Sequence, residues 1–348
     1  MLTVWREPEV PSLPQDDSLA SPCYSPPGHY LWDFWLLKHG EGYHLYHLTA
    51  PRTLPDPEQR HDVARVRYAF SRDLVGWEDR GLVLEPGAPG SWDDLSIWTG
   101  SVIAAHGQFY MLYTGRAAGE RGRVQRIGLA VSRDLQHWER WSDRPLLEAD
   151  PRWYEKAEAS PTGNESWRDP YVYYEPQEAM FYAFITARVK EGDPQGRGCI
   201  AAARSEDLVT WEVLPPVVAP GHFYEMEVPT VWKGNGRYYL TFSTQAQWYT
   251  PEHAEEISPE QPQTGIFYYV SDHLLGPYRP VGKEVLLGTD SGCYTSRTIE
   301  GPKGDDVLLT WRSRVPGVEG FAGCLDRPRR IVYHPDGRLA LEPYEPAS

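Results

Sequence analysis

The sequence is poor in cysteine and has no long apolar run. Its four cysteines among 348 residues are Cys23, Cys199, Cys293 and Cys324, and they form no CxxC pair and no Cys/His metal spacing. We therefore expect reduced thiols, no metal site and no cofactor. No apolar run approaches the roughly 18 residues of a membrane-spanning helix, and the N-terminus carries charges where a signal peptide has its apolar core. These absences predict a cytoplasmic protein.

Basic residues are also in the minority. The chain has 34 Lys and Arg against 49 Asp and Glu, which gives a formal net charge of −15. A surface of this sign repels nucleic acid and anionic membranes. We therefore expect neither as a partner, and the composition leaves the oligomeric state open.

Aromatic residues, glycine and proline are plentiful. The chain contains 14 Trp, 22 Tyr and 9 Phe, together with 31 Gly and 32 Pro spread along its length. Frequent Gly and Pro leave little room for long helices, and aromatic side chains favour strands. Flat aromatic rings also stack on the apolar faces of sugars. The composition therefore indicates an all-β protein and is compatible with a carbohydrate site.

Two short patterns alternate along the chain. The first is a strand followed by Ser, a nearby Asp, Leu and an aromatic residue, and it occurs at 69–81, 130–141, 202–214 and 269–281. The second is an aromatic-rich strand that begins near residues 42, 108, 179, 237 and 307. The Ser–Asp segments predict turns, because short polar side chains bond their own backbone there. We assign these repeats a structural role.

Five such units fill the chain and predict a single-domain, five-bladed β-propeller over residues 1–348. A ring is the natural packing because each sheet alone would expose an apolar face. A β-sandwich or a β-helix is the alternative. We expect an extended Pro-rich segment over about 1–28, a surface loop with a short helix or a lid over 249–263, and no C-terminal β-sandwich.

Acidic residues precede three of the five aromatic hairpins. They are Asp33 in the first unit, Asp169 in the third, and Glu225 and Glu227 in the fourth. In a propeller the innermost strands line one central funnel, so we expect these carboxylates at equivalent positions round it. Glycoside cleavage uses one protonated carboxyl group and one ionised carboxylate. Crowded carboxyl groups move each other's pKa values apart, which provides both forms.

The order of the motifs resembles the β-fructosidase clan, glycoside hydrolase families 32 and 68. The segments that carry the resemblance are WDFW at 32–35, WTGS at 98–101, WRDP at 167–170, EMEVP at 225–229 and LDRPRRIVYHPDGRLALE at 325–342. The resemblance spans about residues 31–342. The Asn-Asp-Pro-Asn-Gly segment of family 32 is absent round the first aspartate, where the sequence is closer to family 68.

The resemblance implies specific roles for these residues. Asp33 would be the nucleophile that forms a covalent fructosyl-enzyme, Glu227 the general acid and base, and Asp169 the stabiliser of the transition state. The implied substrate-binding residues are Trp32, Trp98, Ser101, Arg168 and Glu225, and Tyr294 is added by its position before the fifth hairpin. The expected partner is a small carbohydrate, sucrose or a fructo-oligosaccharide.

Three alternatives to a retaining β-fructosidase remain. A family 43-like enzyme would use the same propeller and an equivalent carboxylate trio to cleave arabinosides or xylosides with inversion. A fructosyltransferase would differ only in the acceptor that takes the sugar. A sugar-binding propeller without activity would keep the fold and lose the chemistry, since fold does not dictate function.

Overall fold

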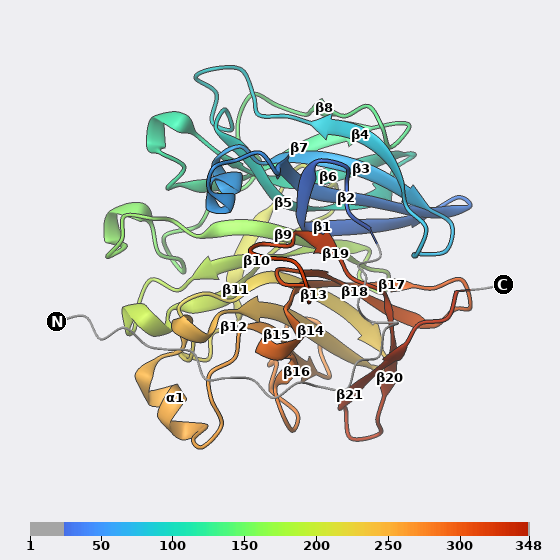
Figure 1. Cartoon of the computed structure of the whole chain (residues 1–348). Coiled ribbons are helices and arrows are strands. Elements are labelled where there is room, and N and C mark those ends of the chain that lie inside the picture. The colour runs from blue at the N-terminus through green and yellow to red at the C-terminus, as the bar shows by residue number, and fades with distance from the viewer. Residues whose placement is uncertain (1–23, 347–348) are drawn as a thin grey trace.

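The computed structural model describes residues 24–346, so Cys23 and most of the segment expected to be extended lie outside the described residues. The described part forms five antiparallel sheets, each built from one contiguous stretch of chain. Figure 1 shows these sheets following one another in chain order. The predicted five-bladed β-propeller is confirmed. No helix among residues 24–346 has the length and apolar character needed to cross a membrane.

The first four blades each contain four strands in sequential order. Blade one contains β1 (His29–His39), β2 (Gly42–Pro51), β3 (Arg65–Ser71) and β4 (Glu78–Leu84). Blade two contains β5 (Ser96–Ala105), β6 (Gln108–Arg116), β7 (Gln125–Ser132) and β8 (Glu139–Arg140). Blade three contains β9 (Trp167–Glu175), β10 (Met180–Arg188), β11 (Gly198–Ser205) and β12 (Glu212–Val218). Blade four contains β13 (Glu227–Gly234), β14 (Arg237–Thr244), β15 (Gly265–Ser271) and β16 (Val285–Leu287).

The fifth blade has one more strand than each of the others. It contains β17 (Cys293–Glu300), β18 (Asp306–Arg312), β20 (Arg329–Tyr333) and β21 (Leu339–Pro343), and β19 (Cys324–Leu325) pairs separately with β18. Short helices lie in the connections: η2 (Pro57–Asp62), η3 (Ala118–Glu120), η4 (Ala157–Ala159), η5 (Pro194–Gly196), η6 (Ala246–Trp248), α1 (Pro251–Glu256) and η7 (Thr289–Ser291). Helix α1 lies within 249–263, so the short helix expected there is present.

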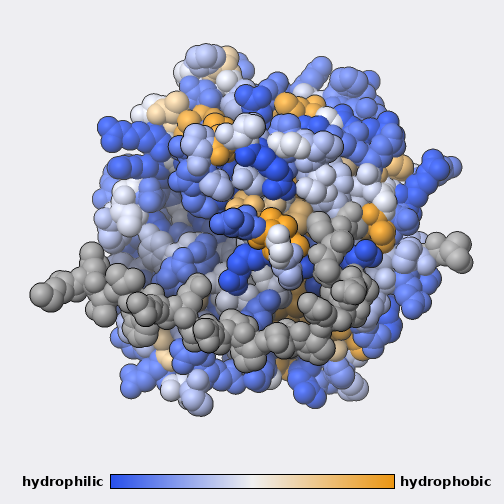
Figure 2. All heavy atoms as spheres, in the orientation of Figure 1, coloured by the Kyte–Doolittle hydropathy of each residue, from blue (hydrophilic) through white to orange (hydrophobic). Residues whose placement is uncertain are grey.

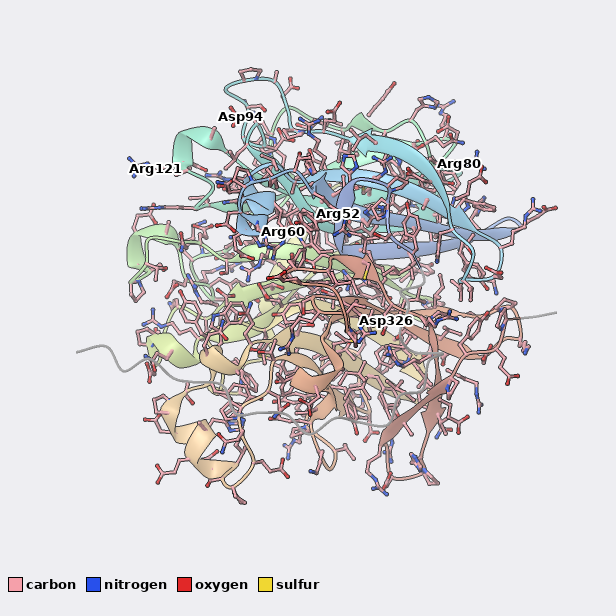
Figure 3. All side chains as sticks on the ribbon, in the orientation of Figure 1. Arg52, Arg60, Arg80, Asp94, Arg121 and Asp326 are labelled. Carbon is pink, nitrogen blue, oxygen red and sulfur yellow. The ribbon has the colours of Figure 1, made fainter. Side chains whose placement is uncertain are left out.

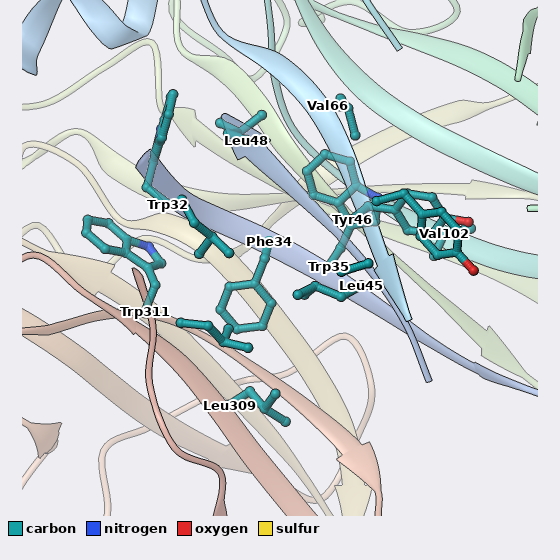
Figure 4. Close-up of a cluster of buried hydrophobic side chains, with 14 of the residues drawn as sticks. Trp32, Phe34, Trp35, Leu45, Tyr46, Leu48, Val66, Val102, Leu309 and Trp311 are labelled. Carbon is teal, nitrogen blue, oxygen red and sulfur yellow. The ribbon is translucent and has the colours of Figure 1, made fainter. Parts of the chain in front are cut away.

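The innermost strands form a closed ring. Each contacts its neighbour in turn: β1 with β5, β5 with β9, β9 with β13, β13 with β17, and β17 with β1. Each blade thereby covers an apolar face of the next. Figure 4 shows part of one resulting cluster, in which Trp32, Phe34 and Trp35 of blade one pack with Leu309 and Trp311 of blade five.

The ring closes where blade one meets blade five, and polar contacts join these two blades in addition to the apolar packing. The Nη2 atom of Arg52, labelled in Figure 3, donates to the carbonyl oxygen atoms of Ala322 at 2.8 Å and Gly323 at 3.1 Å. The Leu31 N–H donates to the same Gly323 carbonyl at 2.9 Å. On β2, the Tyr43 hydroxyl donates to the carbonyl of Glu300 at 3.1 Å. The two ends of the described chain are thus joined without exchange of a strand between blades.

The repeated Ser–Asp segments form turns. In the first, the Ser71 hydroxyl accepts from the Leu74 N–H at 2.9 Å, and the carboxylate of Asp73 accepts from the Gly76 N–H at 2.7 Å. The Trp77 indole N–H then donates to the Leu74 carbonyl. The copies at 132–138 and 205–211 repeat these three contacts. These bonds confirm the structural role expected for the first three repeats, and in the fourth the Ser271 hydroxyl accepts from the His273 N–H at 3.0 Å.

Candidate active site

Each innermost strand is interrupted at the same level of the ring. The register of its pairing shifts at Asp33, Thr99, Asp169, Val228 and Thr295. Four of these residues have a positive φ: 26° for Asp33, 57° for Asp169, 51° for Val228 and 51° for Thr295. Such conformations are costly for residues other than glycine and are concentrated at functional sites. A bulge also turns a side chain away from the regular alternation of the strand.

This pattern corrects one expectation. Asp33 and Asp169 do occupy equivalent positions, each at the bulge of its strand. Glu227 does not, because the bulge position of blade four is Val228 and the glutamate lies one residue earlier. Glu227 belongs to a second set, formed by the residues just before each bulge. Its other members are Trp32, Trp98, Arg168 and Tyr294.

The Asp33 carboxylate is held by three donors from neighbouring blades. Its Oδ1 atom accepts from the Thr295 hydroxyl at 2.6 Å and from the Trp311 indole N–H at 2.9 Å, and its Oδ2 atom accepts from the Thr99 hydroxyl at 2.9 Å. An ionised carboxylate accepts and does not donate. Three donors therefore suit an ionised Asp33 in a fixed orientation.

Asp169 is almost completely buried. Its Oδ2 atom accepts from the Thr186 hydroxyl at 2.9 Å and from the Val228 N–H at 3.3 Å, and it lies 3.4 Å from Nε of Arg168. Burial raises the pKa of Asp169 to about 6, Arg168 opposes this rise, and the negative charge of Asp33 adds to it. Part of the Asp169 population therefore carries a proton in mildly acidic solution.

Glu227 lies between a cation and a phenol. Its Oε1 atom accepts from Nη2 of Arg168 at 2.8 Å, and its Oε2 atom accepts from the Tyr294 hydroxyl at 2.5 Å. Burial raises the pKa of Glu227 to about 7 against the opposing effect of Arg168, and Asp169 contributes to the rise. A carboxyl group with this pKa can give and take a proton near neutral pH, as a general acid and base must.

Arg168 binds carboxylates on three sides. Besides Glu227 and Asp169 it contacts Glu225, with Nη2 to Oε2 at 3.1 Å. The other oxygen of Glu225 accepts from Ser166 at 2.8 Å and from Arg188 at 2.9 Å. Both oxygen atoms of Glu225 are therefore occupied. In this arrangement Glu225 bridges the two arginines and fixes the guanidinium that faces Glu227.

The predicted aromatic walls differ in exposure. Trp98 is partly exposed, its indole N–H donates to the carbonyl of His61 at 2.8 Å, and the Arg116 guanidinium lies 4.1 Å from its ring centre. Trp32 is only 2% exposed, beneath the side chains of His61 and Arg60. Trp98 thus keeps an exposed surface in the pocket beside Glu227, whereas Trp32 is buried in the core, in contact with His61 and Arg60.

Ser101 points between two blades. Its hydroxyl oxygen accepts from the Val172 N–H at 3.1 Å, and the residue is 3% exposed. The structure therefore places this side chain at the contact between β5 and β9, and it is not among the residues that line the pocket beside Glu227.

A pocket of about 230 Å³ opens beside Glu227. Its lining residues are Trp98, Arg116, Gly122, Gln125, Asn164, Ser166, Arg168, Arg188, Tyr224, Glu225, Glu227 and Trp248. Figure 2 shows a hollow with hydrophilic walls on the left of the molecule, the side on which Figure 1 shows β5 and β9 beginning. Polar groups and flat rings in one small concavity are suited to a sugar.

Sequence reasoning missed the donors that hold these carboxylates. Thr99, Thr295 and Trp311 bind Asp33, and Arg188 binds Glu225. Of these residues, only Arg188 belongs to a pattern that is visible in the sequence. The segments YTGR and ITAR repeat a Thr-x-Arg pattern at the ends of β6 and β10, and the second of these arginines is Arg188. Nothing in the sequence marks Trp311, which reaches Asp33 only when the ring closes.

Comparison with known proteins identifies the family of this chain. Residues 26–343 match the family described as Glycosyl hydrolases family 32 N-terminal domain. A levansucrase from Zymomonas mobilis is 28% identical over an alignment of 347 residues. The alignment covers 85% of this chain and 78% of that protein. A sucrose-6-phosphate hydrolase from Pediococcus pentosaceus is 25% identical over 296 residues, covering 81% of this chain and 54% of that protein.

Among solved structures, the inulosucrase from Halalkalicoccus jeotgali bound to kestose superposes with a TM-score of 0.77 at 25% identity, covering 92% of this chain and 89% of that one. The family match extends over nearly all of the described propeller, including every strand. The chain therefore belongs to glycosyl hydrolase family 32 and is a glycoside hydrolase of the β-fructosidase type.

Proposed function

We propose that this enzyme cleaves the β-fructofuranosyl bond of sucrose and short fructo-oligosaccharides with retention of configuration. The observation that carries the proposal is the difference in surroundings between the carboxyl groups of Asp33 and Glu227. Asp33 is held by three donors, whereas Glu227 is a partly buried acid with a pKa of about 7. A retaining glycosidase needs this combination of an ionised nucleophile and a protonated acid.

The reaction has two steps. In the first, an oxygen of Asp33 attacks the anomeric carbon, while Glu227 gives its proton to the departing glucosyl oxygen. In the second, the ionised Glu227 takes a proton from water, whose oxygen attacks the anomeric carbon and releases the aspartate. Asp169 would bind sugar hydroxyl groups and stabilise the positive charge that develops on the ring.

The pocket beside Glu227 supports a second candidate, transfer of the fructosyl group to another sugar. The pocket is lined by Trp98, Tyr224 and Trp248 next to the proposed acid. This is where the glucosyl group would leave and where an acceptor sugar would enter. The similar proteins include a levansucrase and an inulosucrase bound to kestose, as well as the sucrose-6-phosphate hydrolase from Pediococcus pentosaceus.

The test is product analysis on sucrose and on short fructo-oligosaccharides, with aryl arabinofuranoside and xyloside beside them. We expect free fructose and glucose from sucrose, with oligosaccharides rising at high sucrose if acceptor sugars compete with water. Asp33→Asn and Glu227→Gln should each lower kcat by at least about a thousandfold. Asp207→Asn, which changes a turn carboxylate of blade three, is the matched control and should keep full activity.

The covalent step has its own test. An activated fructoside needs no acid for its first step, so Glu227→Gln should accumulate a fructosyl-enzyme that mass spectrometry locates on the peptide containing Asp33. Release of arabinose or xylose in place of fructose would contradict the proposal. So would fructose release that survives both substitutions.

A further inference from the structure

Two histidines and a glutamate meet at the edge of blade four, outside the carboxylate site. One ligand atom from each of His222, His253 and Glu256 lies within 4.8 Å of the other two. His253 and Glu256 are one turn apart on α1, and Thr250 caps that helix by accepting from the His253 N–H. His222 comes from the loop before β13, 31 residues earlier in the chain. Sequence spacing alone does not reveal this group.

The two nitrogen atoms of His253 face different carboxylates. Its Nε2 atom lies 3.3 Å from Oε1 of Glu284, and its Nδ1 atom lies 3.4 Å from Oε2 of Glu256. Glu284 is itself held by the Tyr269 hydroxyl at 3.1 Å. Metal-binding histidines commonly donate their second ring N–H to such a fixed carboxylate, which leaves the other nitrogen free for the ion.

His222 supplies the second nitrogen donor. Its ring stacks on that of His253 with centroids 3.9 Å apart and an interplanar angle of 10°. Its Nδ1 atom is buried and has no hydrogen-bond partner within residues 24–346. A buried ring nitrogen without a partner is costly unless a ligand satisfies it.

We propose that His222, His253 and Glu256 bind one divalent transition-metal ion of the zinc type, with Glu284 orienting His253. Two imidazoles and one carboxylate suit Zn²⁺, Co²⁺ or Ni²⁺, whereas Ca²⁺ and Mg²⁺ prefer sites made only of oxygen atoms. In a tetrahedral site with bonds of about 2.0 Å the donors lie about 3.3 Å apart. Because the stacked rings direct their lone pairs into parallel planes, the His222 ring must tilt to share an ion with His253. The Glu256 side chain, 68% exposed, is free to move toward the same ion.

The ion would join two segments that border the sugar pocket. The Tyr224 N–H donates to the Trp248 carbonyl at 2.7 Å, and the Thr250 N–H donates to the His222 carbonyl at 2.8 Å. The side chains of Tyr224 and Trp248 line the pocket beside Glu227. A metal bound across these segments would fix that wall. It is a structural ion in this proposal, because its ligands make no contact with Asp33, Asp169 or Glu227.

The test is metal binding by the chelator-treated enzyme. Competition with a chromophoric zinc indicator at pH 7.5 should show one Zn²⁺ per chain, unaffected by millimolar Ca²⁺ or Mg²⁺. Saturating Zn²⁺ should raise Tm by a few degrees. His222→Ala and Glu256→Gln should each weaken binding at least tenfold and lower the Tm shift at the same Zn²⁺ concentration. Glu284→Gln should weaken it about 10- to 100-fold.

His137→Ala is the matched control. His137 also pairs with a carboxylate three residues away, with Nδ1 2.6 Å from Oδ2 of Asp134, but lies in a turn of blade two. This variant should bind Zn²⁺ like the unaltered enzyme. Failure to bind stoichiometric Zn²⁺ at micromolar concentrations would overturn the proposal, as would equal binding by Glu256→Gln and the control. Sucrose cleavage is a separate readout, so the metal site and the proposed reaction fail independently.

Discussion

The carboxyl groups of the site differ because their surroundings differ. Arg168 is shared by Asp169, Glu225 and Glu227, and lowers the pKa of both Asp169 and Glu227. Burial overrides that lowering for both, since removal from water disfavours the charged form. The phenol of Tyr294 then favours the ionised form of Glu227 by donating to it. The pKa of the proposed acid is thus set by identifiable neighbours.

Removing the Tyr294 hydroxyl should move the pH profile. Tyr294→Phe deletes a hydrogen bond to the ionised carboxylate, so the pKa of Glu227 should rise. The alkaline limb of kcat/KM for sucrose should then shift upward by about half a unit to one unit. A pH–rate profile against the unaltered enzyme measures this. A downward shift, or an unchanged limb with normal activity, would show that Tyr294 does not tune this acid.

Glu227 should also make stability depend on pH. Its pKa is about 7 in the folded chain and near 4.5 when unfolded, so between these values the folded state holds a proton that the unfolded chain has lost. Stability from this group is complete below pH 4.5 and is lost as pH rises through 7. Glu227→Gln should therefore stabilise the protein at pH 8, by about 1–3 kcal/mol, and have little effect at pH 4.5.

Thermal unfolding of both proteins at the two pH values is the measurement. A variant with equal or lower Tm at pH 8 would contradict the raised pKa.

Hydroxyl groups on the second strands of blades two, three and four support the bulge of the next blade. The Asp169 N–H donates to the hydroxyl of Thr114 on β6 at 3.0 Å, and the Val228 N–H donates to that of Thr186 on β10 at 3.0 Å. The Thr295 N–H donates to Ser243 on β14 at 3.0 Å. A bulged N–H has left its own strand ladder, and the neighbouring blade supplies the missing acceptor.

Thr186→Val should test this support. The substitution removes a donor to Asp169 and the acceptor of the Val228 N–H, so we expect a loss of about 1–3 kcal/mol in the free energy of unfolding and at least a tenfold fall in kcat/KM. Urea unfolding and steady-state kinetics measure the two effects. Thr49→Val, at a buried threonine that donates to the Tyr30 carbonyl, should lose stability without losing kcat/KM. Similar kinetic losses in both variants would contradict a specific role.

At the scale of the whole molecule, Arg297 joins the blades at their centre. It extends from β17 and donates to the carbonyl of Phe34 on β1 at 3.0 Å and to that of Pro229 on β13 at 2.8 Å. A longer contact of 3.4 Å reaches the Gly100 carbonyl on β5, and the guanidinium lies 5.3 Å from the Tyr171 ring centre on β9. One buried side chain thus contacts the other four blades.

Loss of Arg297 should destabilise the whole ring. Burial lowers its pKa to about 10, so it stays charged at neutral pH, where Asp33 and Asp169 favour its charged form. Arg297→Met would leave buried carbonyl groups unpaired, and we expect a loss of at least about 3 kcal/mol by urea unfolding. The control is Arg330→Ala, which removes an exposed ion pair with Glu342 in the same blade and should cost less than about 1 kcal/mol. Equal effects of the two substitutions would contradict the central role.

The sequence by itself determined the fold class and the proteins this chain resembles. Strand periodicity, turns and repetition are local, because side chains three or four residues apart set them, as in the Ser71–Trp77 turn. The acidic residues Asp33 and Asp169 could be found for the same reason, because each is followed in the sequence by a recognisable aromatic-rich hairpin. The roles assigned to these residues remain predictions until the variants are assayed.

Only the tertiary structure decided what surrounds those residues. The Thr295 hydroxyl and the Trp311 indole reach Asp33 across more than 260 residues, and Arg297 contacts its partners only when the ring has closed. Asp169 lies at the bulge of its strand and Glu227 lies just before the bulge of its own strand. The backbone N–H groups of both bulges donate to hydroxyl groups of the preceding blade. His222 and His253 likewise meet through the pairing of two loops. Pairing over such distances depends on packing between whole sheets, which local sequence preferences do not encode.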